Sequence, residues 1–236
     1  MPSLRLPQEA PSLADAVAQA VRDGIAAGEL VPERTYSVYQ LAELLGVSRS
    51  PVREGMLRLA EAGLVVIQRN RGFRVTPPRA HDIQEIIEIR LALEPPAARK
   101  AALWGTEAQH AAIRAALGTM AAAADHDDEA AFWPADRELH DLLLHAAANA
   151  RAAAIVAQLR STTALLGPPT TASGRTLAQI HAEHEPVVTA VLARDGVAAE
   201  AAMRTHLEAT GHLLTANLSS QPVSGSDRRA ASGGGR

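Results

Sequence analysis

Apolar side chains recur at helical spacing through most of the chain, so the sequence predicts a mainly α protein. Near the N-terminus this period predicts a first helix with the apolar stripe Leu13, Val17, Val21 and Ile25. Gly28 is expected to end that helix. Residues 1–11 have no such period and are expected to form a flexible arm, and residues 29–36 are expected to form a loop.

Two short helices separated by a three-residue turn are predicted between residues 37 and 59. Ser37 and Gln40 have the spacing of a capping box. The helix that they open ends at Gly46 and has the apolar residues Val38, Leu41, Leu44 and Leu45 on one side. The next helix can be capped by Ser48 or Ser50, and its core-facing positions are Val52, Gly55, Met56 and Leu59. This order is typical of a DNA-binding helix-turn-helix.

A β-hairpin is predicted directly after the second of these helices. Residues 63–67 and 73–75 have the composition of strands, and residues 68–72 form a basic turn between them, which together make a wing. Arg49 and Arg53, four apart, share the edge of the helix near its N-terminus, where the helix dipole also favours phosphate. Any amphipathic helix carries arginines on its exposed face, but the hairpin and wing around these two favour DNA binding.

Only helical periodicity is found after residue 76, so the second domain is expected to be an all-α antiparallel bundle of six or seven helices. The sequence Glu94-Pro95-Pro96 is expected to interrupt its first helix before a short continuation to Trp104. The expected division of the chain is a winged helix-turn-helix domain at 12–76, a linker at 77–80, the bundle at 81–217 and a disordered tail at 218–236.

Composition limits the function classes. The 236 residues contain no cysteine, which excludes disulfides and thiolate metal sites. The net charge is −3, yet residues 49–74 hold six arginines against two glutamates, which gives +4 there and leaves −7 for the remainder. A basic patch on an acidic body is typical of a site-specific DNA binder with a separate regulatory domain. No segment has the pattern of a membrane helix or a signal peptide, so a cytoplasmic protein is expected, nucleoid-associated when bound to DNA.

Four metal-capable side chains lie within apolar stripes of the predicted bundle. Asp136 and His140, four apart, share one face, while His184 and His206 each continue the apolar stripe of a later helix. Burying these groups without partners is costly, and one divalent cation would satisfy all four. The alternative is that each histidine bonds a backbone carbonyl in the core. That interpretation is preferred for four other histidines, His110, His126, His145 and His212.

Specific motifs in both halves resemble known families. The segment 41–54, LAELLGVSRSPVRE, with AGLV at 62–65 and RGFRV at 71–75, closely resembles the winged helix-turn-helix of GntR-family bacterial transcription regulators over residues 12–76. Gly55 stands where that family usually has Ala, and it is expected to soften the helix by about 1 kcal/mol. DRELH at 136–140, HAEHEPVV at 181–188 and AMRTHL at 202–207 resemble the FCD ligand-binding domain of the FadR subfamily.

The first resemblance implies that Arg49 and Arg53 contact bases or phosphates from the major groove. Ser48 and Ser50 would hold the DNA backbone, and the turn at residues 71–72 would place the wing near the minor groove. The positions expected to bind DNA are therefore Ser48, Arg49, Ser50, Arg53, Arg71 and Gly72. One wing and one short helix read little sequence, so a homodimer on two half-sites is expected.

The second resemblance implies that a divalent metal ion is bound by Asp136, His140, His184 and His206. It also implies a small carboxylate effector beside the metal. Arg90 is the strongest candidate to hold that anion, although a buried salt bridge with Glu94 explains it equally well. Arg160 and Arg175 are weaker candidates, since either can be solvated.

Together these features predict a sequence-specific transcription regulator, most simply a repressor, and not an enzyme. Its expected partners are double-stranded operator DNA, a small organic acid and a second copy of the chain, with no membrane. Zinc is the expected metal, with nickel or manganese as alternatives. Control by the metal alone and a purely structural metal are the competing interpretations. A metal-dependent hydrolase is a weaker one, because no general base is clearly placed to activate water.

Overall fold

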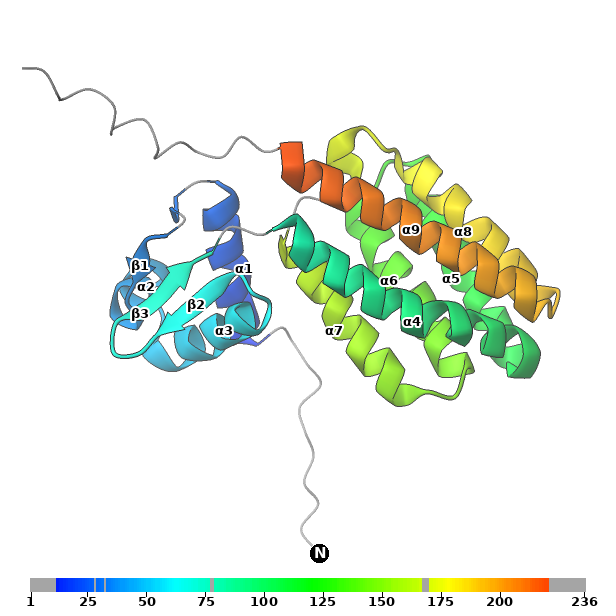
Figure 1. Ribbon diagram of the computed structural model, residues 1–236, viewed down its shortest axis with the longest axis horizontal. Coiled ribbons are helices and arrows are strands. Elements are labelled where there is room, and N and C mark those ends of the chain that lie inside the picture. The colour runs from blue at the N-terminus through cyan, green and yellow to red at the C-terminus, as the bar shows by residue number, and fades with distance from the viewer. Residues whose placement is uncertain (1–11, 28, 32, 77–78, 167–169, 221–236) are drawn as a thin grey trace, which may run out of the picture.

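Two domains make up the computed structural model, which describes residues 12–27, 29–31, 33–76, 79–166 and 170–220 (Figure 1). The sequence-based expectations for residues 1–11, Gly28, the start of the linker and most of the tail lie outside the described residues. The N-terminal domain, here called the head, ends at Thr76, and the helical bundle begins with the helix at Ala80. Among the described residues, no helix combines the length and apolar character needed to cross a membrane.

In the part of the head that the structure describes, three helices accompany a small sheet. The helices are α1 (Leu13–Ala26), α2 (Val38–Leu45) and α3 (Arg49–Glu61), and the strands are β1 (Thr35–Tyr36), β2 (Val65–Gln68) and β3 (Gly72–Val75). The strand order is β1-β3-β2, with antiparallel pairing throughout. The predicted helix-turn-helix and wing are therefore confirmed.

The loop expected at residues 29–36 was wrong at its end, because Thr35 and Tyr36 form a third strand against β3. Gly72 explains why this strand can lie so close. Its φ is +122°, and a Cβ atom at this position would collide with the Tyr36 carbonyl oxygen. The sequence did not predict this strand, because two residues are too few to show the alternation of apolar and polar positions that is typical of a strand.

The caps of the head follow the sequence in part. Ser37 and Gln40 form the predicted capping box, and Gly46 ends α2 in the left-handed conformation with φ +65°. Ser48 occupies the N-cap of α3, but its side chain makes no capping hydrogen bond. Of the apolar residues expected on one side of α2, Leu41 is buried, whereas Leu44 is 72% exposed.

Gly55 allows α3 to pack closely on α1. A Cβ atom at this position would lie 2.7 Å from the Ala14 carbonyl oxygen and 3.0 Å from Val17 Cγ1. The expectation that Gly55 merely softens the helix was therefore incomplete, because an alanine would clash with the backbone of α1. The cost of glycine in α3 is offset by the close contact of the two helices.

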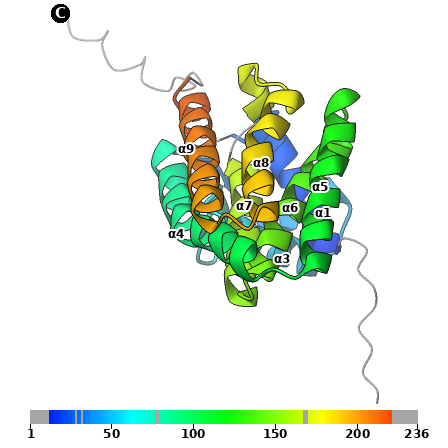
Figure 2. The same ribbon diagram turned by 90° about the vertical axis from the view of Figure 1, so that its right-hand side faces the viewer.

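Six α-helices form the bundle in the described part of the chain, together with a short 3-10 helix. In chain order these are α4 (Ala80–Trp104), α5 (Glu107–Asp125), α6 (Glu129–Ala146), α7 (Ala150–Leu166), η1 (Thr170–Ser173), α8 (Leu177–Leu192) and α9 (Gly196–Ser220). Figure 2 shows the bundle from its far end. Helix α9 continues three residues past the expected end at Asn217.

The predicted interruption of the first bundle helix was wrong, because α4 runs without a break through Pro95 and Pro96. Each proline removes one helical N–H donor. Buried residues on both sides of the pair hold the helix in place, among them Ile87 and Arg90 before it and Ala98 and Ala101 after it. Tertiary packing thus overrides a strong local signal.

The two domains share apolar contacts. Ile83, Ile86 and Ile87 of α4 and Leu214 of α9 belong to the same buried cluster as the core of the head, which includes Val52 and Leu59. A separate cluster built on α4, α5, α6, α8 and α9 fills the bundle. The start of α4 and the end of α9 therefore form the surface on which the head rests.

Candidate metal centre and DNA-binding face

Most of the head residues predicted to bind DNA are exposed. Arg49 and Arg53 on α3 and Arg71 in the turn between β2 and β3 are exposed, as are Ser48 and Ser50. Each of these positions was predicted from the sequence, and each keeps its charged or hydroxyl group accessible. Gly72 differs, because its close contact with Tyr36 already explains the residue without DNA.

Two of the six arginines in the basic segment are paired with acidic residues. Arg58 contacts Asp15 of α1, and Arg74 contacts Glu33. Tyr39 is a residue that sequence analysis assigned no role: its side chain is 61% exposed, and Arg49 Cζ lies 5.8 Å from the centre of its ring. A guanidinium over an aromatic ring is attracted to it, so Tyr39 helps to orient Arg49.

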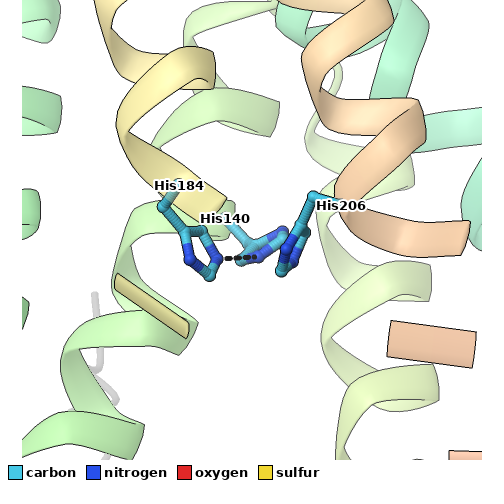
Figure 3. A group of neighbouring side chains, drawn as sticks. All are labelled: His140, His184 and His206. Carbon is cyan, nitrogen blue, oxygen red and sulfur yellow. Dashed lines mark hydrogen bonds between the residues drawn. The ribbon is translucent and has the colours of Figure 1, made fainter. Parts of the chain in front are cut away.

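Three imidazoles converge inside the bundle from three different helices (Figure 3). His140 comes from α6, His184 from α8 and His206 from α9, and all three are buried. One ligand atom of each lies within 4.8 Å of the others. The sequence therefore placed these three residues on the correct helices and faces.

Hydrogen bonds on the outer side of each ring fix which nitrogen points inward. His184 Nδ1 donates to the Ile180 carbonyl oxygen at 2.8 Å, and His140 Nδ1 contacts the Glu94 carboxylate. His206 Nδ1 lies 3.2 Å from Glu183 Oε2. With Nδ1 protonated in all three rings, each Nε2 atom is left as an electron-pair donor.

The donor set fits a divalent metal ion. His140 Nε2 and His184 Nε2 lie only 3.2 Å apart, and two facing lone pairs repel unless a cation lies between them. Two nitrogens bound to one tetrahedral zinc ion at about 2.1 Å would be roughly 3.4 Å apart. Burial and the neighbouring Arg160 lower the pKa of His140 to about 4, although Glu94 and Asp136 act in the opposite direction. The ring is therefore neutral near pH 7, as a metal ligand must be.

Asp136 lies at the edge of the same group. Its Oδ1 atom is 3.2 Å from His184 Nε2 and 4.0 Å from His140 Nε2, while Oδ2 contacts Arg160. Burial alone would raise the pKa of Asp136, but Arg160 and His184 outweigh it and hold that pKa well below its usual range. The carboxylate is thus charged and lies close to two of the three imidazoles, but the donor atoms that all lie within 4.8 Å of one another come from the histidines without Asp136.

Glu94 is a site residue that sequence analysis missed. It is buried and contacts His140 through Oε2, while its Oε1 accepts from Arg90 Nε at 2.6 Å. Burial alone would raise the pKa of Glu94, but Arg90 and His140 together hold it below its usual range. The i to i+4 spacing indicated the Arg90 pair, but nothing in the sequence indicated a histidine partner 46 residues away.

Glu183 was also missed, and it supports the third histidine. Its carboxylate contacts both His206 Nδ1 and the buried Arg175. Arg175 was considered as a solvated arginine, and the structure instead places it in the interior with Thr170 as a further neighbour at 3.4 Å. The three histidines are therefore surrounded by charged residues contributed by α4, α8 and the segment before α8.

A cavity of about 1310 Å³ opens beside the histidines and reaches the head. Its lining includes Arg160, Arg175 and His206 of the bundle and Arg22 and Leu59 of the head. Besides Arg175 Nη2, which is paired with Glu183, four of the buried polar atoms that lack a hydrogen-bond partner in the described part of the chain belong to residues of this lining. They are Arg22 Nε, Arg90 Nη2, Arg160 Nε and Thr210 Oγ1. Unpaired donors are costly in a protein interior, so their convergence on one cavity favours a polar ligand there.

The other histidines divide differently from the expectation. His110 is buried and its Nε2 lies 2.9 Å from the Ala101 carbonyl oxygen, as expected of a core histidine. Three others, His126, His145 and His212, are exposed rather than in the core, although His145 Nδ1 donates to the Asp141 carbonyl oxygen at 2.8 Å. They lie on the outer surface of the bundle, where the apolar period does not reach.

Two family models match the chain, one for each domain. "Bacterial regulatory proteins, gntR family" matches residues 13–75, and "FCD domain" matches residues 85–209, which is more than half of the chain. The first coincides with the head and the second with the bundle that holds the three histidines.

Relatives that match most of the chain are found among curated and solved proteins. The HTH-type transcriptional regulator LutR of Bacillus subtilis is 32% identical over 76% of this chain and 91% of its own length. The HTH-type transcriptional repressor RspR of Escherichia coli is 30% identical over 76% of this chain and 78% of its own length.

A solved structure of McbR/YncC from E. coli has the same fold, with a TM-score of 0.63 at 21% identity over 87% of this chain and 98% of the other. The matched models, these relatives and the helix-turn-helix with its wing agree on the nature of the molecule. It is a DNA-binding transcription regulator rather than an enzyme. The chain belongs to the GntR family of bacterial regulatory proteins and carries an FCD domain.

Proposed function

We propose that this chain is a regulator of the FadR subfamily that binds operator DNA as a homodimer and releases it when a small organic acid binds in the bundle. In the proposal the acid binds beside a divalent metal ion, zinc in the first place, held by Asp136, His140, His184 and His206. The observation that carries the proposal is the approach of His140 Nε2 to His184 Nε2 at 3.2 Å beside a cavity lined by arginines.

The metal and the arginines have separate roles in this proposal. A bound divalent ion would supply positive charge to which a carboxylate oxygen can coordinate. Arg160 contacts Asp136 and has an unpaired Nε, so it can donate a hydrogen bond to the carboxylate of the bound acid. Arg90 donates to Glu94, and Glu94 in turn contacts His140. The main role of Arg90 is therefore to hold the carboxylate that supports this histidine.

The DNA contacts are proposed for the exposed edge of α3 and for the wing. Arg49 and Arg53 would enter the major groove, with Ser48 and Ser50 on the DNA backbone and Arg71 near the minor groove. Their exposure supports this assignment. Repression is the simplest form of control, and RspR, one of the relatives, is named a repressor.

The test combines thermal unfolding with DNA binding. Metal-stripped and zinc-loaded protein are screened against small carboxylates and sugar acids, and a ligand at a hundred times its dissociation constant should add about 2.7 kcal/mol to the free energy of unfolding. We expect at least one acid to stabilise only the zinc-loaded form and to weaken binding to an operator selected from random DNA.

His184→Ala should abolish both effects, while the control His212→Ala, at an exposed position of α9, should keep them. Stabilisation by zinc without any acid would instead support control by the metal alone. If an acid stabilised the metal-stripped and the zinc-loaded protein equally, the result would contradict the proposed site.

A further inference from the structure

The cavity beside the histidines extends beyond the bundle. Its lining continues onto the head, where α1 contributes Gln19 and Arg22 and the end of α3 contributes Leu59 and Ala62. A small acid coordinated at the histidines would leave this second end of the cavity without contacts. The volume of about 1310 Å³ is more than such an acid needs.

The head end carries its own unpaired donor. Arg22 donates through Nη2 to Gln19, whereas its Nε is buried and has no hydrogen-bond partner. Burial lowers the pKa of Arg22, although the neighbouring Asp23 acts in the opposite direction. A guanidinium in this environment gains most from an oxygen acceptor that enters the cavity.

Apolar side chains line the cavity where the head and the bundle meet. Leu59 and Ala62 of α3 and Ala18 of α1 line it from the head, and Leu214 of α9 lines it from the bundle. These side chains offer no hydrogen bonds, so they favour a hydrocarbon segment of the occupant. The lining therefore combines polar groups of both domains with apolar side chains, of which Leu59 and Leu214 belong to one buried cluster shared by head and bundle.

We propose, resting on the function proposed above, that the effector is an elongated organic acid that bridges the two domains. One carboxylate lies at the histidines and Arg160, an apolar middle lies along Leu59 and Leu214, and a second acidic group accepts from Arg22 Nε. Such a ligand holds the head against the bundle directly. It regulates DNA binding because α3, whose far end carries Arg49 and Arg53, forms one wall of its site.

This arrangement explains how occupancy reaches the DNA. A ligand shifts a conformational equilibrium only if it binds one state better than the other. An acid confined to the bundle touches no residue of the head, whereas a bridging acid binds tightly only when head and bundle have the relative position seen here. The ligand thereby selects one placement of each recognition helix in the proposed dimer.

The test uses the zinc-loaded full-length chain and a series of straight-chain diacids from succinate to sebacate, each compared with the monocarboxylic acid of equal carbon number. We expect an optimum within the diacid series, where the diacid binds about 10- to 100-fold more tightly than its monoacid, because a charge-assisted hydrogen bond contributes that much. Binding is measured by isothermal titration calorimetry.

Arg22→Gln separates this proposal from the function on which it rests. In that variant the advantage of the diacid should vanish, and the diacid should no longer change DNA affinity, while zinc affinity and DNA binding without acid stay unchanged. Arg114→Gln, which removes the same charge from an exposed position on α5, should behave like the wild type.

Zinc-dependent binding of monoacids and diacids with equal affinity, insensitive to Arg22→Gln, would overturn the bridge and leave the effector site in place. If no acid in either series binds the zinc-loaded chain, the bridge is overturned together with the proposed effector control. A diacid advantage that survives Arg22→Gln would likewise reject the role of this arginine.

Discussion

The head and the bundle differ in how they present their functional side chains. In the head, the arginines proposed to meet DNA come from residues 49–71 and are exposed. In the bundle, the histidines come from three helices, are buried, and each has a hydrogen-bond partner behind it. The exposed residues can therefore change with little effect on stability, whereas the buried ones contribute to folding and function together.

This difference is tested most strongly by Arg53→Ala. Each arginine bonded to a guanine is worth about 1–3 kcal/mol, and a homodimer would lose the contact twice, so operator affinity should fall by about 2–6 kcal/mol. The free energy of unfolding should change by less than about 0.5 kcal/mol, because the side chain is exposed. Fluorescence anisotropy with labelled operator and chemical denaturation measure the two quantities.

The matched control for Arg53→Ala is Arg58→Ala on the same helix. Arg58 is also exposed, but its guanidinium is paired with Asp15 of α1, so its loss should leave operator affinity near the wild-type value. Equal losses in the two variants would mean that α3 acts only through its net charge and that Arg53 has no specific role.

In the bundle, Glu94→Gln should affect metal binding and stability together. The substitution leaves Arg90 buried without its counter-charge, which costs about 3–5 kcal/mol, and it weakens the orientation of His140. Loss of a partner behind a metal ligand typically lowers metal affinity about 10- to 100-fold. Zinc titration and denaturation of metal-free protein measure both effects, and Glu138→Gln, at an exposed position of α6, is the control.

A fall in stability without a change in zinc affinity would make Glu94 a purely structural residue. The reverse result, a loss of zinc affinity with unchanged stability, would show that Arg90 finds another partner when Glu94 is neutral. Either outcome would weaken the contrast drawn between the two domains.

Gly72→Ala tests whether Gly72 in the wing contacts DNA or only allows β1 and β3 to pack closely. The position was proposed for DNA contact, yet its φ is +122° and a Cβ atom would collide with the Tyr36 carbonyl oxygen. We expect a loss of about 2–3 kcal/mol in head stability from strain and displacement of β1. Unchanged stability with weaker operator binding would instead support a direct role at the DNA.

The parts of the molecule that could be predicted from the sequence are those fixed by neighbouring residues. The capping box at Ser37, the left-handed Gly46 and the apolar stripes that carry His140, His184 and His206 all depend on spacings of a few residues. Their positions in the fold follow from helical geometry alone.

The features that could not be predicted depend on partners far apart in the sequence. Strand β1 exists because β3 pairs with it, and α4 continues through Pro95 and Pro96 because the bundle packs on both halves of the helix. Glu94 gains its role only when α4 lies against α6, which no local pattern reveals. The unpaired Nε of Arg22 likewise becomes a feature only when the head meets the bundle.

The smallest expected effect concerns two glycines in helices. At Gly55 an added Cβ atom would lie 2.7 Å from the Ala14 carbonyl oxygen, so Gly55→Ala should destabilise the head by about 1–2 kcal/mol despite the better helix propensity of alanine. At Gly118, in the middle of α5, nothing lies within 4 Å of the added atom. Gly118→Ala should therefore stabilise the bundle by about 0.5–1 kcal/mol. Thermal denaturation of both variants compares them directly. A stabilising Gly55→Ala would mean that α1 can move away from α3, and the close packing of these helices would then not be what keeps glycine at this position.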